Sequence, residues 1–319
     1  MKNKRILITG GTGSFGRAFT KKILSEEDPH SIVVFSRDEW KQWEMRNSDP
    51  IFRSEKIRYF LGDIRDRSRL KRAFQDVDYV VHAAALKQVP AAEYNPTEFI
   101  LTNVLGSSNI IEASLDAGVE KVIALSTDKA VNPVNLYGAT KLCADKLFIS
   151  GNSYVGRRGF PIFSVARYGN VLKSRGSLIE LWKKKIEEGA KSLPITDERM
   201  TRFWMTIDEA TSFVVQSLRE MKGGEIFIPK IPSMKIIDVA KTIAPELPID
   251  IIGIRAGEKI HELLINEEEG RRTVDRGGYY AVIQKSGKEE PFMRDGFFYG
   301  SENNDQWLTP DQLIQLLAK

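Results

Sequence analysis

Two residue pairs in the middle of the chain have the types and spacing needed for chemistry on an alcohol. The first is Tyr137 and Lys141, which are four residues apart and would share one face of a helix. An ammonium group beside a tyrosine stabilises the phenolate and lowers the tyrosine pKa from about 10. The pair can then remove the proton of a hydroxyl group while a hydride leaves the same carbon atom, which predicts a dehydrogenation step.

The second pair is Asp128 and Lys129, in a Ser-Thr-Asp-Lys stretch shortly before Tyr137. A simple dehydrogenase or an epimerase needs only a hydroxyl residue and the tyrosine–lysine pair at this place. An additional acid and an additional base therefore indicate a second proton transfer. A surface ion pair or a helix cap is the alternative interpretation.

A glycine-rich stretch near the N-terminus lies between an apolar run and a predicted helix. It reads Gly10-Gly11-Thr12-Gly13-Ser14-Phe15-Gly16. Glycines permit a tight turn and let backbone N–H groups approach a pyrophosphate, whose negative charge the helix N-terminus favours. In this context the pattern predicts a dinucleotide site, and a glycine-rich turn without a ligand is the alternative.

The residues after the second apolar run bear on the choice of dinucleotide. Enzymes that select NAD usually place an acidic residue there, where it holds the ribose 2′-hydroxyl. Here Ser36 occupies that position, Arg37 follows it, and Lys41 comes one turn later. A guanidinium suits a 2′-phosphate, so we expect NADP; a solvated arginine at a helix start is the alternative. Asp63 is expected either to accept from the adenine amino group or to cap a short turn.

Short apolar strands alternate with helices along the first half of the chain and would position these residues. This predicts an α/β fold with a doubly wound, Rossmann-like parallel sheet and a smaller C-terminal substrate domain. We expect residues 1–168 to bind NADP and residues 169–319 mainly to bind substrate, with 206–228 as a segment that could fold back onto the first domain. The expected strands are 5–9, 31–35, 56–61, 79–82, 121–125, 161–166, 226–228, 249–254 and 280–283. The expected helices are 14–24, 38–46, 68–74, 96–117, 135–149, 177–188 and 207–221.

The composition narrows the class of protein. The 319 residues carry a net charge of +4 with acidic and basic residues mixed, so no nucleic-acid partner is expected. The single cysteine, Cys143, cannot form an internal disulfide and fits a reducing compartment. No stretch approaches the ~20 apolar residues of a membrane span, so we expect a cytoplasmic protein without a membrane partner. The three histidines are too dispersed to suggest a metal site, and we interpret His261 as packing against or capping a helix.

Taken in order, these motifs resemble the extended short-chain dehydrogenases/reductases that act on nucleotide sugars. Most specifically, the chain resembles the inverting UDP-N-acetylglucosamine 4,6-dehydratases of pseudaminic acid biosynthesis. Retaining hexose dehydratases of that superfamily have a glutamate where this chain has Lys129. The resemblance covers nearly the whole chain, and further stretches that carry it are 83–90, 167–171, 200–203, 255–262 and 304–308.

The resemblance implies a sequence of proton and hydride transfers. Tyr137, helped by Lys141, would take the C4 hydroxyl proton while the C4 hydride passes to NADP⁺. Lys129 would then remove the acidified C5 proton, and Asp128 would protonate the departing C6 hydroxyl as water. Hydride return to C6 and protonation of C5 from the opposite face would invert C5 and regenerate a tightly held cofactor. Asp128 and Lys129 are adjacent and coupled, so which is acid and which is base stays open. For Lys129 to act as a base, burial or a neighbouring cation such as Lys87 should lower its pKa.

The resemblance also implies which residues hold the ligands, and Asn103 is expected to hold the backbone near the site. The cofactor residues are expected to be Gly10, Thr12, Gly13, Ser14, Phe15, Gly16, Ser36, Arg37, Asp38, Lys41, Asp63, Ile64, Ala83, Ala85, Lys87, Tyr137 and Lys141. The expected substrate residues are Lys87, Asn170, Val171, Arg202, Arg255 and Glu258. Among them, the guanidiniums of Arg202 and Arg255 are expected on the nucleotide diphosphate.

Two other functions remain open at this point. A nucleotide-sugar C4 epimerase would share the fold, the cofactor and the Tyr137–Lys141 pair, but would leave Asp128 and Lys129 idle. A redox-sensing protein that binds the nucleotide without turnover is disfavoured by the intact catalytic residues. The identity of the UDP-sugar rests on the resemblance alone, and the downstream pathway is open. Members of the family associate, so a homo-oligomer is expected.

Overall fold

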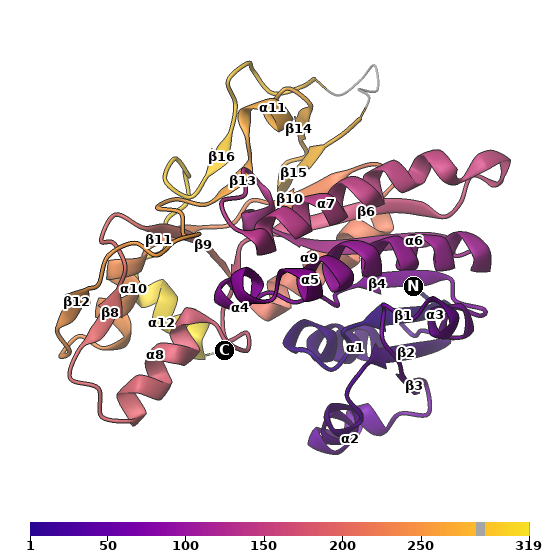
Figure 1. The fold of residues 1–319 in the computed structure, drawn as a ribbon, viewed down its shortest axis with the longest axis horizontal. Coiled ribbons are helices and arrows are strands. Elements are labelled where there is room, and N and C mark those ends of the chain that lie inside the picture. The colour runs from indigo at the N-terminus through magenta and orange to yellow at the C-terminus, as the bar shows by residue number, and fades with distance from the viewer. Residues whose placement is uncertain (285–290, 319) are drawn as a thin grey trace.

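The computed structural model describes residues 1–284 and 291–318. Their main feature is a nine-stranded sheet with the order β14-β15-β10-β6-β5-β4-β1-β2-β3 (Figure 1). All strands from β3 across to β10 are parallel, and β15 and β14 continue the sheet in antiparallel fashion. The strands are β1 (Arg5–Thr9), β2 (Ser31–Ser36), β3 (Ile57–Leu61), β4 (Tyr79–His82), β5 (Lys121–Thr127), β6 (Ile162–Tyr168), β10 (Ile226–Pro229), β14 (Thr273–Asp275) and β15 (Tyr279–Val282).

Helices cover both faces of this sheet, which confirms the predicted doubly wound α/β class. Helices α1 and α9 pack together on one face, and α6 packs between α3 and α7 on the other. The helices of this part are α1 (Ser14–Glu26), α2 (Glu39–Ser48), α3 (Arg67–Ala73), α4 (Val89–Tyr94), α5 (Pro96–Phe99), α6 (Gly106–Ala117), α7 (Leu136–Gly151) and α9 (Ile207–Glu220). Short 3₁₀ turns are η1 (Pro50–Arg53), η3 (Asp128–Ala130), η4 (Asn152–Tyr154) and η5 (Gly156–Arg158).

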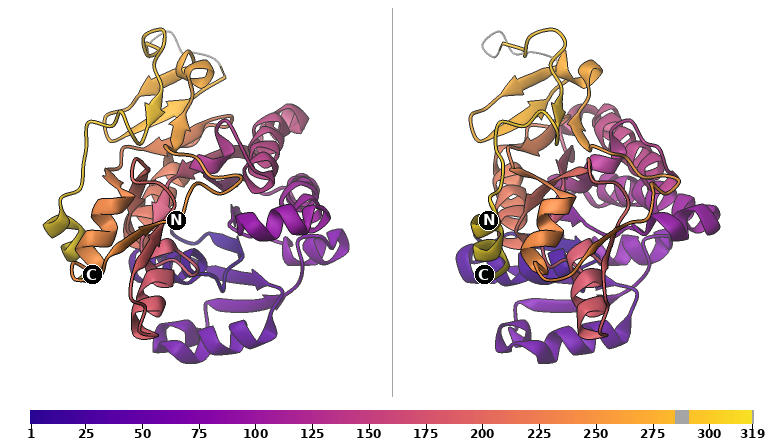
Figure 2. Two further views of the ribbon diagram at one scale, coloured as in Figure 1. Left: turned by 60° about the vertical axis from the view of Figure 1, so that its left-hand side comes forward. Right: turned by 90° about the vertical axis from the view of Figure 1, so that its left-hand side faces the viewer.

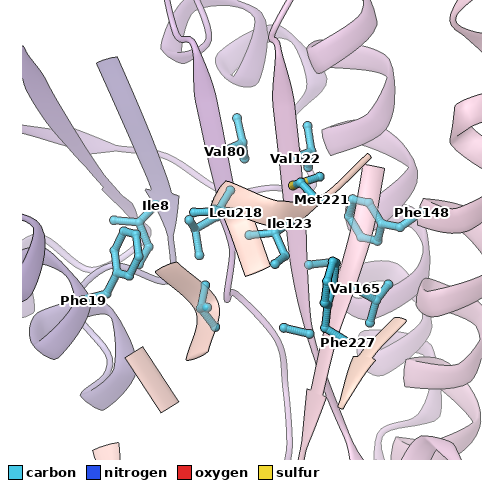
Figure 3. Packing of buried hydrophobic residues seen from close by; sticks show 14 of the residues in the cluster. Ile8, Phe19, Val80, Val122, Ile123, Phe148, Val165, Leu218, Met221 and Phe227 are labelled. Atoms are coloured by element: carbon cyan, nitrogen blue, oxygen red, sulfur yellow. The ribbon is translucent and has the colours of Figure 1, made fainter. Parts of the chain in front are cut away.

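The central strands are continuous apolar runs because both of their faces are covered. Ile6, Leu7 and Ile8 of β1 are completely buried, as are most side chains of β2. Figure 3 shows Phe19 of α1 and Phe148 of α7 among the buried side chains packed around these strands. This packing holds the carboxyl ends of the parallel strands at one edge of the sheet.

The helix expected over residues 96–117 is divided in the structure. α5 leads into a π-helical turn, η2 (Ile100–Leu105), and only then into α6. A π turn adds a residue to the helical repeat and rotates the side chains that follow it, and such turns are frequent at functional sites. α4 is a further helix that the apolar pattern did not predict, and it begins with Pro90 in its first turn.

The C-terminal part has its own smaller core, built around Trp182, Trp204 and Met234. Figure 2 shows its orange and yellow segments gathered at one side of the first half. Residues after 168 also enter the main sheet as β10, β14 and β15, so the division at residue 168 stays a prediction. The remaining elements are β7 (Asn170–Val171), β8 (Leu193–Ile195), β9 (Thr201–Met205), β11 (Ser233–Lys235), β12 (Ile249–Ile251), β13 (Leu263–Ile265), β16 (Tyr299–Gly300), α8 (Leu178–Glu187), α10 (Ile236–Ile243), α11 (Glu267–Gly270) and α12 (Pro310–Ala318). Among the described residues, no helix has the length and apolar character needed to cross a membrane.

Candidate functional site

A cavity of about 640 Å³ opens along the carboxyl ends of the parallel strands. Its wall includes residues at or just after the ends of β1 to β6, which is where open α/β sheets bind ligands. It brings together many residues expected at the site: Gly10, Thr12, Gly13, Ser14, Phe15, Gly16, Ser36, Arg37, Asp38, Lys41, Ile64, Ala83, Ala85, Lys87, Lys129, Tyr137, Lys141, Asn170 and Val171.

The glycine loop at one end of the cavity has the geometry of a phosphate cradle. Gly10 adopts φ +64°, and a Cβ there would lie 3.0 Å from the backbone of Ala84. A Cβ on Gly16 would meet the backbone of Gly11, so only glycine lets α1 pack this close to β1. Among the described residues, no side chain caps the N-terminus of α1, where a bound anion would be favoured.

The cavity continues to the start of α2. Asp38 caps this helix by accepting from the Lys41 N–H at 3.0 Å, and Arg37 stands on the cavity wall with its side chain half exposed. Asp63 does not line the cavity. Its carboxylate accepts from the main chain and the guanidinium of Arg65 and lies 3.7 Å from Arg37. These bonds fit the turn-capping alternative, and the adenine contact stays a prediction.

Tyr137 and Lys141 are both buried and line the cavity from α7. Lys141 Nζ donates to the Leu125 carbonyl at 2.7 Å. Burial raises the pKa of Tyr137 to about 12, and Lys129 offsets only part of this. The prediction that Lys141 lowers the Tyr137 pKa is therefore wrong: desolvation dominates, and the cation acting on Tyr137 is Lys129.

Asp128 and Lys129 form the turn η3 at the end of β5. Lys129 lines the cavity, whereas Asp128 lies behind it and is 1% exposed. Lys129 Nζ is 3.0 Å from Asp128 Oδ1 and 3.4 Å from Glu262 Oε1. Burial alone would lower the pKa of Lys129, but the two carboxylates outweigh it and raise that pKa. The expectation of a lowered Lys129 pKa is wrong because the adjacent Asp128 carboxylate, joined by Glu262 from a distant segment, outweighs burial.

Asn103, on the π-helical turn, holds the loop that precedes α4. Its side chain accepts from the Leu86 N–H at 2.9 Å and donates to the Leu86 carbonyl at 2.9 Å. It also donates to Thr140 Oγ1 on α7 at 3.0 Å. These bonds confirm the predicted role of Asn103 in holding the backbone next to Lys87.

The substrate residues expected from the sequence fall into two groups. Asn170 and Val171 of β7 line the cavity together with Lys87. Arg202 does not: its guanidinium donates to the carbonyls of Thr201, Lys259 and Ile260 at 2.7 to 2.9 Å.

Arg255 and Glu258 lie in a loop away from the cavity wall, 4.0 Å from one another. His261 is outside any helix and shares a hydrogen bond of 2.9 Å with Thr201 Oγ1, so the expected helix packing or capping is wrong. Contact of Arg202, Arg255 and Glu258 with substrate stays a prediction.

Residues 6–284 match the family model described as polysaccharide biosynthesis protein. The chain belongs to this family. Two Campylobacter jejuni relatives, each named UDP-N-acetylglucosamine 4,6-dehydratase (inverting), are 51% identical over 98% of this chain and 97% of their own length. A Rickettsia prowazekii relative named UDP-glucose 4-epimerase is 42% identical over 88% of this chain and 83% of its own length.

Two solved structures resemble this chain over most of its length. Pen from Bacillus thuringiensis superimposes with a TM-score of 0.89 at 34% identity, covering 99% of this chain and 98% of that chain. DesIV from Streptomyces venezuelae, a dTDP-glucose 4,6-dehydratase with NAD and TYD bound, has a TM-score of 0.70 at 23% identity over 80% of this chain and 86% of that chain. At that identity the DesIV likeness shows the fold alone.

The site of this family member contains two sets of residues that sequence reasoning missed. The first is Glu262, which lies beside Lys129. It was missed although it belongs to the 255–262 stretch that carries the family resemblance. Asp145, one turn after Lys141, accepts from Ser126 and pairs with the buried Arg167. The four-residue spacing from Lys141 was the available signal for Asp145. Within residues 1–284 and 291–318, no cluster of three or more His, Cys, Asp or Glu side chains could hold a metal ion.

Proposed function

We propose that the chain is a C5-inverting UDP-N-acetylglucosamine 4,6-dehydratase, a lyase that eliminates water. Its product is UDP-2-acetamido-2,6-dideoxy-L-arabino-4-hexulose. The observation that carries the proposal is the meeting of Tyr137, Lys141 and Lys129 in the cavity that begins at the glycine loop. The 51% identity to two proteins of that name, over 98% of the chain, supports the substrate.

The cofactor in this proposal is NADP, held tightly and regenerated in each turnover. The uncapped N-terminus of α1 and the close approach of Gly10 to Ala84 fit a pyrophosphate, and Arg37 and Lys41 fit a 2′-phosphate. When bound, the oxidised nicotinamide would take up and return the sugar hydride and add a positive charge. Residues 1–168 then contain most of the cofactor site, and residues 169–319 contribute mainly to the substrate side.

The protein's own residues carry out the proton transfers from two neighbouring elements. Tyr137 acts from the start of α7, and Asp128 and Lys129 act from the turn η3. Tyr137 takes the C4 hydroxyl proton, which requires its raised pKa to fall when positive charge approaches it. Lys141, fixed by the Leu125 carbonyl, would help to hold the bound cofactor, and Lys129 is the cation that acts on Tyr137. Lys129 exchanges protons with C5 and the C6 oxygen from the cavity wall, and Asp128, which lies 3.0 Å from its Nζ behind that wall, shares its proton as a coupled partner.

The deciding experiment is NMR of the reaction of the purified protein with UDP-N-acetylglucosamine in D₂O. We expect a 4-keto-6-deoxy product with deuterium at C5 and the L-arabino configuration. The same ketone with C5 retained would refute inversion and the role of Lys129. Interconversion at C4 without loss of water would instead establish an epimerase, the activity named for the Rickettsia relatives. A Lys129→Ala variant that binds NADP and reacts like the wild type would refute the second proton transfer.

A further inference from the structure

We propose that Glu262 is a positioning residue for the Lys129 ammonium, and that the C5 proton transfer depends on its carboxylate. The inference rests on the function proposed above and assigns a residue from the C-terminal part to the same site. Glu262 does not line the cavity, so it acts through Lys129 rather than on the sugar.

The position of the Glu262 carboxylate is set by main-chain hydrogen bonds and by burial of its side chain. Its main-chain N–H donates to Ser301 Oγ at 2.9 Å, and its carbonyl accepts from the Ser301 N–H at 2.8 Å. Its side chain is 4% exposed, and Oε1 lies 3.4 Å from Lys129 Nζ. The main chain is therefore pinned, and the buried side chain leaves Oε1 directed at the lysine.

Lys129 consequently lies between two buried carboxylates that come from distant parts of the chain. Asp128 Oδ1 is 3.0 Å from Nζ and also accepts from Thr127 Oγ1 at 2.8 Å. Among the described residues, Asp128 Oδ2 and Glu262 Oε2 have no hydrogen-bond partner. Burying a carboxylate with an unsatisfied oxygen is costly, and a neighbouring cation offsets part of that cost.

Other charges face this group from every element around it. Arg202 Nε of β9 lies 3.7 Å from Glu262 Oε1, and Lys259 Nζ lies 3.8 Å from Oε2. Across the cavity, Lys87 and the Tyr137 hydroxyl also interact with the Lys129 charge. The cations of Lys129, Arg202 and Lys259 thus meet the carboxylates of Asp128 and Glu262. Removal of Glu262 would leave Lys129 with one carboxylate among these cations.

The arrangement has a consequence for catalysis. With the Glu262 carboxylate 3.4 Å from its Nζ, Lys129 is held as a cation at a fixed point on the wall, and its proton becomes available only when bound substrate changes the charges around it. Without the Glu262 charge, Lys129 would lose its proton at lower pH. Among the two carboxylates, only Asp128 would then hold the Lys129 Nζ.

The test is the titration of Lys129 in the full-length, NADP-bound protein, followed by the ¹³Cε shift of labelled lysine and assigned with Lys129→Arg. We expect Glu262→Gln to lower the Lys129 midpoint by about 1–3 pH units and Glu262→Asp to restore it in part. The pH profile of deuterium incorporation at C5 should move in the same direction. Glu225→Gln is the matched control, because Glu225 is a buried carboxylate bonded to Ser164 outside the cavity, and it should leave both curves unchanged.

Unchanged Lys129 titration in folded Glu262→Gln would overturn the inference. If Glu262→Gln does not fold, a wild-type Lys129 midpoint at or below the ordinary lysine value would overturn it by itself. The NMR titration needs no turnover, so it separates this inference from the proposed function. Failure of the wild type to make the 4-keto product would refute the dehydratase proposal. The titration of Lys129 would still test the role of Glu262.

Discussion

Ser126 Oγ donates a hydrogen bond of 2.7 Å to Asp145 Oδ2, which joins the end of β5 to the helix that carries Tyr137 and Lys141. Asp145 also lies 3.2 Å from Arg167 Nη2 of β6, and Arg167 holds both oxygens of Glu269 in α11. The buried groups form one chain beneath the cavity. It couples the catalytic helix to the C-terminal part of the molecule.

Asp145→Asn is expected to destabilise the protein by about 3 kcal/mol. The substitution keeps the shape but removes one of the two carboxylates that face the buried Arg167 guanidinium, while Glu269 still pairs with it. A hydrogen bond between charged groups contributes about 1.5–3 kcal/mol. Urea unfolding at neutral pH measures the change. Asp311→Asn in α12, an exposed site, should stay within about 0.5 kcal/mol of the wild type. A similarly small effect for Asp145→Asn would mean that the network contributes little to stability.

Tyr137→Phe is expected to reduce turnover by at least about 10²-fold while leaving the fold intact, because it removes only the hydroxyl that accepts the C4 proton. The rate of 4-keto product formation, with a thermal melt of each protein, measures both quantities. Tyr154→Phe, an exposed tyrosine outside the cavity, is the control and should retain wild-type turnover. Full activity of Tyr137→Phe would assign the proton transfer to another group.

Arg37→Ala is expected to weaken binding of NADP by about 10-fold or more and to change binding of NAD little. A charge-assisted hydrogen bond to a 2′-phosphate contributes about 1.5–3 kcal/mol, and NAD lacks that group. Calorimetric titration of wild type and variant with each dinucleotide gives the change in the dissociation constants for NADP and NAD. Arg72→Ala, on the exposed side of α3, should leave both affinities unchanged. Equal losses for NAD and NADP would show that Arg37 does not read the 2′-phosphate.

His82 makes the protein sensitive to acid. Burial, with a smaller contribution from Lys141, lowers the pKa of His82 to about 3, whereas an unfolded histidine titrates near 6.5. The unfolded chain therefore binds the proton more readily, and the stabilisation present above pH 6.5 is lost as the pH falls towards 3. Between pH 7 and pH 5 the loss from this residue is about 2 kcal/mol.

The His82→Gln variant isolates this effect in urea unfolding at the two pH values. It is less stable at pH 7 because the bond to Thr9 Oγ1 is altered, but it should lose about 2 kcal/mol less than the wild type on moving to pH 5. His30→Gln, on the exposed surface, should follow the wild-type curve. Parallel losses in His82→Gln and wild type would mean that His82 is not the acid-sensitive group.

The sheet could be predicted because its strands are buried on both faces. β1 and β4 begin and end at the expected residues, since continuous apolar runs between glycine or polar residues leave few other boundaries. β14 was not predicted, because a three-residue edge strand has too short a pattern to recognise. The π turn at Ile100–Leu105 was also missed, because its sequence is as helical as its neighbours and only the bonds of Asn103 explain it.

The candidate site was predicted in its residue types but not in its electrostatics. Local spacing placed Tyr137 and Lys141 on one face of α7, and both line the cavity. The directions of the Tyr137 and Lys129 pKa shifts were wrong, because burial and charges from distant segments set them. Arg202 was expected on a phosphate; its guanidinium donates to three carbonyl oxygens, and its contact with substrate stays a prediction.

The sequence by itself determined the alternation of strands and helices in the first half, the glycine loop and the identity of the reactive side chains, because these depend on local periodicity and spacing. Only the tertiary structure decided which charges meet. Glu262 reaches Lys129 through the docking of the C-terminal part on η3, and Arg167 is enclosed by Asp145 and Glu269. Electrostatic interactions act through space rather than along the chain, and their strength depends on how far folding excludes water.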